Sequence, residues 1–229
     1  MDKHFDELKP RAVLGVAAHP DDLDFMAGGA MARFAGAGAQ VYYLVLTDGA
    51  SGSDDRSMTP SRLIRIRQDE QRAAAQVLGL ADVFFCDYGD GTLENTLAVK
   101  RDIVRVIRRI KPDVVVTFDP STLFAAESGS INHPDHRAAG QAALDAVFPL
   151  ARDHMAFPEL LAEGLEPHQT STVLLMNPHV SNFTVDISKA IKQKLDALSQ
   201  HASQMPPRAQ LEAQFASKVF ETFVRIDIR

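Results

Sequence analysis

The stretch VLGVAAHPDDLDFMAGG (residues 13–29) decides how this chain folds, because a short apolar run ends there in one imidazole and two adjacent carboxylates. An apolar run that is followed by a turn is typical of a buried strand. His19, Asp21 and Asp22 would then lie at the carboxyl end of that strand, where open α/β sheets bind their ligands. Three ionisable groups this close together would repel or desolvate one another unless a cation held them. A divalent metal is the simplest candidate for that cation.

Composition and charge limit the classes of protein that fit. The chain has 229 residues, of which 45% are hydrophobic and 24% are charged, which is enough for one well-packed domain over residues 1–229. Its net charge of −6 argues against a nucleic-acid or anionic-membrane surface, where clustered Lys and Arg would be needed. A single Cys excludes an internal disulfide, and no uncharged apolar run is long enough to span a membrane. We therefore expect a cytoplasmic protein that acts on a small molecule and binds neither nucleic acid nor membrane.

Strand-like and helix-like segments alternate four times from the opening stretch onward. This alternation predicts an α/β fold with a Rossmann-like, doubly wound and mostly parallel sheet that carries helices on both faces. Its core would cover about residues 11–150, and residues 171–229 would complete it. Residues 149–170 have no pattern that places them. After the first strand, further strands are expected at residues 41–47, 82–86, 114–118, 172–176, 183–186 and 223–228, and helices at 24–36, 61–78, 100–111, 133–147, 187–200 and 207–219.

A second cluster of the same residue types, HPDH (residues 133–136), follows the fourth strand and the loop at residues 119–132. In the usual doubly wound strand order, 3-2-1-4-5, the first and fourth strands are neighbours. The two clusters should therefore meet, although more than a hundred residues separate them. A catalytic zinc takes three protein ligands and keeps one position for water. His19, one of Asp21 and Asp22, and His136 would supply that set.

HPDD after a strand and HPDHRAAG before a helix make the chain resemble the PIG-L/LmbE-type deacetylases. These are metal-dependent hydrolases that remove the N-acetyl group from N-acetylglucosamine-containing molecules. The resemblance covers most of the chain and implies a single LmbE-like deacetylase domain that hydrolyses a linear amide bond. Other segments look like family signatures in family order: LTDGASGS at 46–53, the R-x-x-E and VLG pattern at 67–79, YGDGTL at 88–93, PDVVVTFDP at 112–120 and LSQHASQM at 198–205.

The resemblance also implies which residues would hold the metal. His19, Asp22 and His136 would bind Zn²⁺, with Fe²⁺ as the alternative, and Asp21 would stay free as the general base. A base needs an open oxygen within hydrogen-bond reach of the metal-bound water that attacks the amide, so it cannot also serve as a ligand.

Four further residues receive roles by the same resemblance. His133 would stabilise the oxyanion, and Asp135 would orient His133 and keep it protonated. Arg67 and Asp90 would hold the sugar hydroxyls. Either Asp21 or His133 would protonate the departing amine, and the role of His201 in the HASQ segment stays open.

Other interpretations compete with these. Asp21 and Asp22 could cap the helix that follows them, and HPDH could be only a helix start with Pro in its first turn. The protein could also be a metal-dependent hydratase or lyase on the same fold, or a sugar-binding module without activity. The sequence does not identify the aglycone or the metal used in the cell. Family resemblance favours a homo-oligomer, either a trimer or a hexamer.

Overall fold

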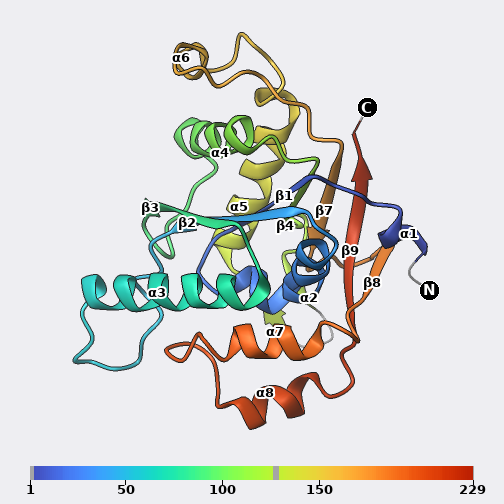
Figure 1. The fold of residues 1–229 in the computed structure, drawn as a ribbon. Coiled ribbons are helices and arrows are strands. Elements are labelled where there is room, and N and C mark those ends of the chain that lie inside the picture. Colours follow the sequence, from blue (N-terminus) through green and yellow to red (C-terminus); the bar gives the residue numbers. More distant parts are fainter. Residues whose placement is uncertain (1–2, 126–128, 229) are drawn as a thin grey trace.

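A mixed β-sheet lies at the centre of the molecule (Figure 1). The computed structural model describes residues 3–125 and 129–228. Within these residues, seven strands form the sheet in the order β3-β2-β1-β4-β7-β9-β8. Their bounds are Ala12–Ala17 for β1, Gln40–Thr47 for β2, Asp82–Tyr88 for β3, Val114–Phe118 for β4, Thr172–Met176 for β7, Phe183–Asp186 for β8 and Phe220–Asp227 for β9.

Most of the sheet is parallel, as predicted. The neighbouring pairs from β3 through β2, β1 and β4 to β7 are all parallel. Only β9 runs against its two neighbours, β7 and β8. β1 and β4 pair directly, with Val13 opposite Val114 and Gly15 opposite Val116. The Rossmann-like sheet and the adjacency of the first and fourth strands are thus confirmed.

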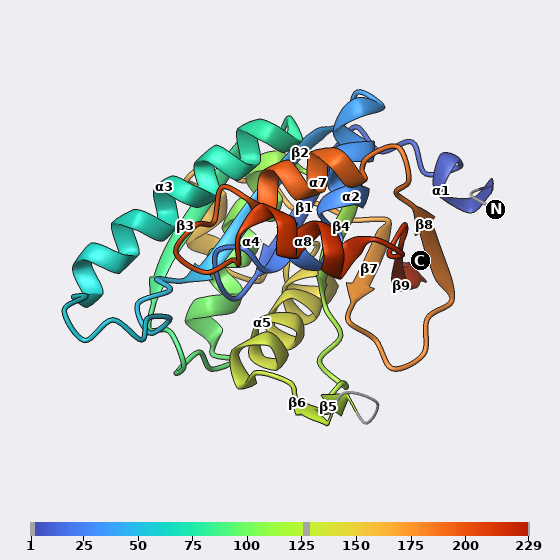
Figure 2. The ribbon, with the colours of Figure 1, turned by 90° about the horizontal axis from the view of Figure 1, so that it is seen from below.

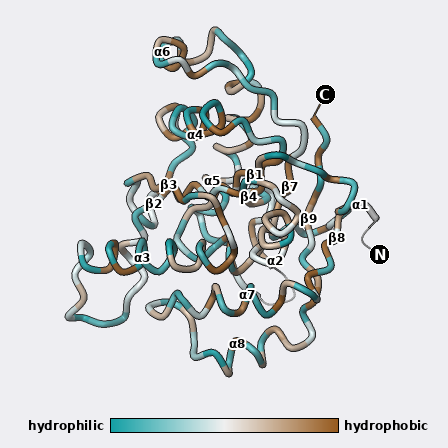
Figure 3. Tube along the Cα trace, in the orientation of Figure 1, coloured by the Kyte–Doolittle hydropathy of each residue, from teal (hydrophilic) through white to brown (hydrophobic). Residues whose placement is uncertain are grey.

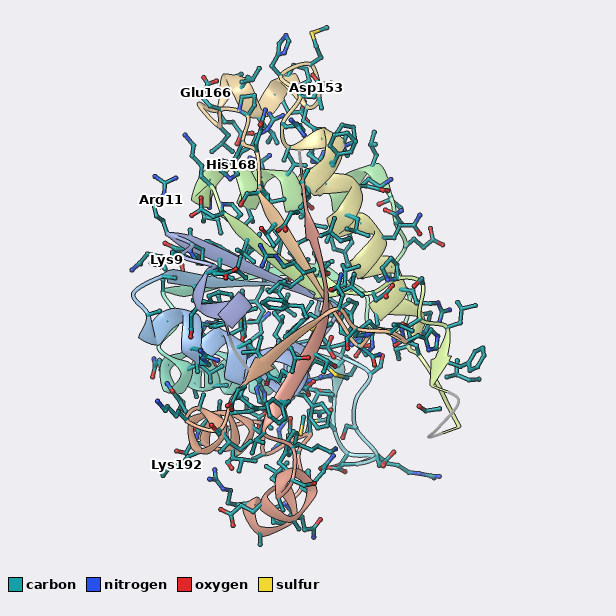
Figure 4. The ribbon with its side chains drawn as sticks, turned by 90° about the vertical axis from the view of Figure 1, so that its right-hand side faces the viewer. Lys9, Arg11, Asp153, Glu166, His168 and Lys192 are labelled. Atoms are coloured by element: carbon teal, nitrogen blue, oxygen red, sulfur yellow. The ribbon has the colours of Figure 1, made fainter. Side chains whose placement is uncertain are left out.

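Helices cover both faces of the sheet (Figures 1 and 2). On one face α2 (Asp22–Gly36), α3 (Pro60–Leu78) and α7 (Ile191–Leu198) pack together, and α8 (Arg208–Phe215) contacts α7 from outside. On the other face α4 (Leu97–Ile110) packs against α5 (Pro134–Asp145). The view from the β8 edge in Figure 4 accordingly places Lys192 of α7 on one side of the sheet, with Asp153 and Glu166 on the other.

The two central strands form the middle of the hydrophobic core. Every residue of β1 and β4 is buried, because helices cover these strands on both faces; their side chains are therefore apolar in succession instead of alternating. Figure 3 shows hydrophobic stretches along the central strands and hydrophilic ones in the outer loops. Among the residues described, no helix has both the length and the apolar character needed to cross a membrane.

Short elements occupy the segments that the sequence left open. A π-helical turn (Ala146–Leu150) and α6 (Pro158–Ala162) lie in or beside residues 149–170. The segment 119–132, predicted as a loop, contains the paired two-residue strands β5 (Phe124–Ala125) and β6 (Ser130–Ile131); residues 126–128 lie outside the described residues. A short α1 (Lys3–Asp6) precedes β1.

Several predicted boundaries shift, each for a local reason. α2 begins two residues early, because the amide of Phe25 already bonds to the carbonyl of Asp21. α4 begins three residues early, since the Thr96 hydroxyl caps it by accepting from the amide of Val99. β9 begins at Phe220, because it pairs with β8 from there onward.

A buried ion pair joins three elements on the α2 face. Lys194 of α7 lies 2.6 Å from Glu221 of β9. The Glu221 carboxylate also accepts hydrogen bonds from the amides of Gly29 and Ala30 in α2, at 2.9 and 2.7 Å. Both charged groups are therefore partnered, as a buried charge requires, and α2 and α7 are both tied to β9.

Candidate metal centre

The two His/Asp clusters meet where β1 and β4 end. His136 Nε2 lies 3.1 Å from one Asp22 oxygen, and His19 Nδ1 lies 3.4 Å from the other. The ring of His133 is 4.7 Å from that of His19, edge to face. Parallel neighbouring strands bring their carboxyl ends to the same edge of a sheet, which is why segments so far apart in the chain converge here.

The two adjacent aspartates differ in what they contact. Asp22 Oδ2 accepts from the backbone amide of His19 at 2.7 Å, which closes the turn after β1. Asp21, at the N-cap of α2, has a left-handed backbone with φ 87° and makes no side-chain cap hydrogen bond. Its carboxylate lies instead 3.3 Å from Arg67. The helix-capping interpretation is therefore wrong for Asp21.

His136 is oriented by a residue that the sequence analysis missed. His136 Nδ1 lies 3.1 Å from Asn132 Oδ1, and its ring stacks on Phe118 with a centroid separation of 4.1 Å. An amide oxygen can only accept, so Nδ1 donates to Asn132 and Nε2 is the nitrogen that faces Asp22. Histidine ligands usually have such a partner on the second nitrogen, and this need was the one signal that could have identified Asn132.

His133 and Asp135 do not interact in the predicted way. His133 caps α5 through Nδ1, which accepts from the Asp135 amide at 3.2 Å, so its proton lies on Nε2. The Asp135 carboxylate accepts from the amides of Gly91 and Leu93 and lies 3.2 Å from His19 Nε2. Burial, with the nearby charge of His19, lowers the pKa of His133. The charge of Asp135 acts to raise the pKa of His133, but burial and His19 outweigh it, so the expectation that Asp135 keeps His133 protonated is corrected.

Arg67 and Asp90 both reach the site. Arg67 is buried and donates to the carbonyls of Gly49 and Pro20 at 2.9 and 3.0 Å. Asp90 lies 3.1 Å from His19 Nε2 and 3.7 Å from Arg67. They border a pocket of about 260 Å³. The pocket is lined by His19, Ser51, Gly52, Arg67, Asp90, Gly91 and His133. The sequence analysis did not single out Ser51, Gly52 or Gly91.

The site concentrates negative charge around one imidazole. Burial alone would lower the pKa of His19, but hydrogen bonds and charges from Asp22 and Asp90 raise it to about 10. Burial would raise the pKa of Asp90, yet His19, the Ser51 amide and Arg67 hold it at about 2. Burial likewise opposes ionisation of Asp22, and its histidine neighbours place the pKa well below the usual range. The pocket thus strongly favours positive charge at its centre.

Asp21 behaves differently from these carboxylates. Burial and the adjacent Asp22 charge raise the pKa of Asp21 to about 7, against the opposing charge of Arg67. A carboxylate with a pKa near neutrality can both accept and release a proton at physiological pH. Of the four aspartates in the site, Asp21 is thus the one suited to acid–base chemistry.

These residues fit a divalent metal. Ligand atoms of His19, His133 and His136 all lie within 4.8 Å of one another, and a second group joins His19 and His133 with Asp90 and Asp135. Imidazole nitrogens and carboxylate oxygens are the donors that zinc and ferrous sites use. The raised pKa of His19 indicates that the site favours positive charge, which a divalent cation would also supply. Binding of the cation would release the proton from His19.

The fold and the site together define the class: an α/β protein with a His/Asp metal centre where its first and fourth strands end. The sequence profile of the PIG-L family, described as GlcNAc-PI de-N-acetylase, matches residues 14–147. The chain belongs to this family.

Individual relatives of known sequence or structure agree with this family assignment. The diacetylchitobiose deacetylase of Thermococcus kodakarensis is 35% identical over 86% of this chain and 71% of its own length. The solved N,N'-diacetylchitobiose deacetylase of Pyrococcus horikoshii superposes with a TM-score of 0.84 at 27% identity, covering 99% of this chain and 90% of its own. The 4-carboxy-2-hydroxymuconate hydratase of Pseudomonas putida KT2440 shares the fold, with a TM-score of 0.77 at 22% identity over 96% of this chain and 97% of its own. The fold by itself therefore does not fix the reaction.

Proposed function

We propose that this protein is a metal-dependent hydrolase that removes the N-acetyl group from a small molecule containing N-acetylglucosamine. The observation that carries the proposal is Asp21, a carboxylate with a pKa of about 7 that stands beside the His/Asp cluster and contacts Arg67. A binding module would need the cluster but not this base. Membership of the PIG-L family and likeness to diacetylchitobiose deacetylases support the same reaction.

His19, Asp22 and His136 would hold the metal, Zn²⁺ or alternatively Fe²⁺. The contacts of Asp22 with both imidazoles support this ligand set. When bound, the metal would act as a Lewis acid that polarises the amide carbonyl and makes a water molecule more acidic. Asn132 orients the ring so that Nε2 of His136 would face the metal.

The chain's own residues then move the protons. Asp21 accepts a proton from the attacking water on one carboxylate oxygen, while Arg67 holds the carboxylate in place. His133 donates a hydrogen bond from its Nε2–H to the amide oxygen as negative charge develops there, and keeps that proton, since its Nδ1 is already engaged. Asp21 returns its proton to the leaving nitrogen, because the lowered pKa of His133 leaves that ring neutral.

Arg67 and Asp90 would bind the sugar hydroxyls at the same pocket. A guanidinium donates and a carboxylate accepts, so the pair suits vicinal hydroxyl groups. Asp135 would act through the site's geometry, since its carboxylate ties the turn at Gly91 and Leu93 to His19.

The test is metal content of the purified protein together with acetate release from N-acetylglucosamine and a panel of its glycosides, with a chelator control. We expect bound metal and acetate release that the chelator abolishes. Bound metal without acetate from any substrate would count against the deacetylase and favour the hydratase alternative, which hydration of a 2-hydroxymuconate-type substrate would then test. If the purified protein neither contains metal nor releases acetate, the ligand assignment would lose its basis.

The organisation of the protein is part of the proposal. Residues 1–229 would form a single deacetylase domain, with residues 171–229 completing a core at about 11–150; the pairing of β7 with β4 in one sheet supports this. The protein would act in the cytoplasm as a homo-oligomer, a trimer or hexamer. Light scattering coupled to size-exclusion chromatography measures the oligomeric state.

A further inference from the structure

The backbone of Asp21 has a conformation that its own side chain does not explain. Its φ of 87° and ψ of −27° lie in the left-handed region, which residues with a β-carbon rarely adopt. Such a conformation persists only where surrounding contacts hold it, and it often occurs at functional sites. The contacts that hold Asp21 should therefore matter for where its carboxylate points.

Two side chains from one face of α3 supply these contacts. Gln71 Oε1 accepts from the backbone amide of Asp21 at 2.8 Å. Arg67, one turn earlier, donates to the carbonyl of Pro20 at 3.0 Å and to the Asp21 carboxylate at 3.3 Å. Residues four apart on a helix lie on the same face. α3 thus holds both the carbonyl and the amide of the Pro20–Asp21 peptide unit.

The amide of Gln71 is itself held from the other side. Its Nε2 donates to Asp24 Oδ2 at 2.8 Å, and the same oxygen lies 2.7 Å from His201 Nε2. Gln71 is 1% exposed, and Asp24 and His201 are 0% exposed, so water does not compete for these bonds. The Asp24 carboxylate oxygen accepts from the NH₂ of Gln71. Asp24 therefore turns the NH₂ of Gln71 toward itself and leaves the carbonyl oxygen facing the Asp21 amide.

We propose that Gln71 is a positioning residue that holds Asp21 in the conformation in which its carboxylate serves the site, and that Asp24, paired with His201, sets the orientation of the Gln71 amide. The inference rests on the proposed function in that it takes Asp21 to be the general base. It also gives the histidine of the HASQ segment a role, since His201 is linked to Asp21 through Asp24 and Gln71. Among the hydrogen bonds of the described residues, His201 makes none with the proposed metal ligands.

The proposal separates Gln71 from residues that merely pack the helices. Gln193 offers a matched control: its side-chain amide also joins two helices, donating from α7 to the carbonyl of Val77 in α3 at 2.8 Å. Gln71→Leu removes the acceptor for the Asp21 amide, whereas Gln193→Leu removes one interhelical hydrogen bond away from Asp21. Both variants have the same change in composition.

For Gln71→Leu we expect kcat for acetate release to fall roughly 10- to 100-fold, because a misplaced catalytic group loses reactivity steeply. KM for the sugar should stay within about twofold and metal content should match the wild type, since neither the substrate-binding pair nor the ligands is altered. Gln193→Leu should keep kcat within about twofold. Equal kcat values in Gln71→Leu and wild type would overturn the proposal, as would parallel loss of activity in both variants.

A charge exchange tests the role of Asp24. Gln71→Glu keeps an acceptor for the Asp21 amide but places a second carboxylate against Asp24, so kcat should fall. Adding Asp24→Asn restores a donor–acceptor pair with reversed polarity. The double variant should have a kcat at least tenfold above that of Gln71→Glu, a coupling that a double-mutant cycle measures. A double variant no more active than Gln71→Glu alone would overturn the assignment of Asp24.

Crystal structures provide a readout that does not depend on the reaction. We expect the φ of Asp21 to leave the positive region in Gln71→Leu and to stay positive in Gln193→Leu. A positive φ with an unmoved carboxylate in Gln71→Leu would overturn the proposal. If the wild type releases no acetate, the proposed function fails, yet this comparison still decides whether Gln71 positions Asp21.

Discussion

At the scale of single residues, two neighbouring carboxylates are suited to separate tasks because they face different partners. Asp22 faces two imidazoles, which keep it ionised. Asp21 is buried and faces Arg67, whose positive charge only partly offsets the effects of burial and of the Asp22 charge on the pKa of Asp21. A difference in environment is enough to give two chemically identical groups different roles.

This division predicts the effect of Asp21→Asn. The variant should keep its metal, because the imidazoles and Asp22 are unchanged, and should lose acetate release by roughly 10²- to 10⁴-fold, because an amide cannot accept the proton. Metal analysis and steady-state kinetics on the same preparation measure both effects. Asp22→Asn is the matched control and should lose metal. If Asp21→Asn loses the metal instead, the two roles are exchanged.

Cys86 allows a prediction about pH away from the site. Burial, with the negative charges of Asp102 and Asp87, raises the pKa of its thiol to about 12. At pH 8 the reactive thiolate is then about one ten-thousandth of the total, against roughly a quarter for an ordinary Cys. Reaction of the folded protein with a disulfide reagent should therefore be slow and should rise about tenfold per pH unit up to pH 10.

Two controls accompany this measurement. Protein unfolded in urea should react as an ordinary thiol, with its rate levelling off above about pH 9. Asp102→Asn removes a negative charge and should speed the reaction of the folded protein. A rate that levels off below pH 10 in the folded wild type would contradict the raised pKa.

At the scale of elements, α5 carries His136 to the site by packing very closely on β4. A β-carbon at Gly140 would overlap the carbonyl oxygen of Phe118 and lie 3.1 Å from its carbonyl carbon. That oxygen belongs to the backbone of a buried strand and cannot move aside as a flexible side chain could. The absence of a side chain at Gly140 thus sets how near α5, and with it His136, approaches the end of β4.

Gly140→Ala should therefore destabilise the protein by about 1–3 kcal/mol through overpacking. Urea unfolding followed by circular dichroism measures the change. Gly36→Ala is the control, because a β-carbon at Gly36 meets nothing within 4 Å at the end of α2, and it should be neutral or slightly stabilising. Equal stability of Gly140→Ala and wild type would show that α5 can shift without cost.

At the scale of the whole molecule, the metal centre couples folding to metal binding. Its proposed ligands come from two segments that only the folded sheet brings together, so the unfolded chain has no comparable site. Saturating Zn²⁺ should raise the free energy of unfolding, by about 2.7 kcal/mol at a hundred times the dissociation constant. Chelation should reverse the gain, and thermal unfolding with and without metal measures it.

Two histidine variants sharpen this test. His136→Ala removes a proposed ligand and should abolish most of the zinc-dependent shift in Tm. His154→Ala removes a histidine whose side chain is 75% exposed and which lies outside the metal-binding groups found among the described residues, so the shift should remain. An unchanged shift in His136→Ala would mean that zinc binds elsewhere.

The sequence by itself determined the alternation of strands and helices, the mostly parallel sheet and the meeting of HPDD with HPDH. These features depend on local periodicity and on the general rule that parallel strands share one carboxyl edge. The strands at Thr172–Met176 and Phe183–Asp186 could be predicted to the residue, since both are short apolar or β-branched runs between polar turns.

Only the tertiary structure decided how the side chains around the site pair with one another. It bonded the Asp135 carboxylate to the amides of Gly91 and Leu93, joined Asn132 to His136, and connected His201 to Asp24 across 177 positions of the chain. Such contacts depend on the rotation of each helix and on how closely it approaches the sheet, which are set by packing over the whole core. Local sequence patterns carry no record of these distances, so the sequence could single out Asp21 but not its contact with Gln71.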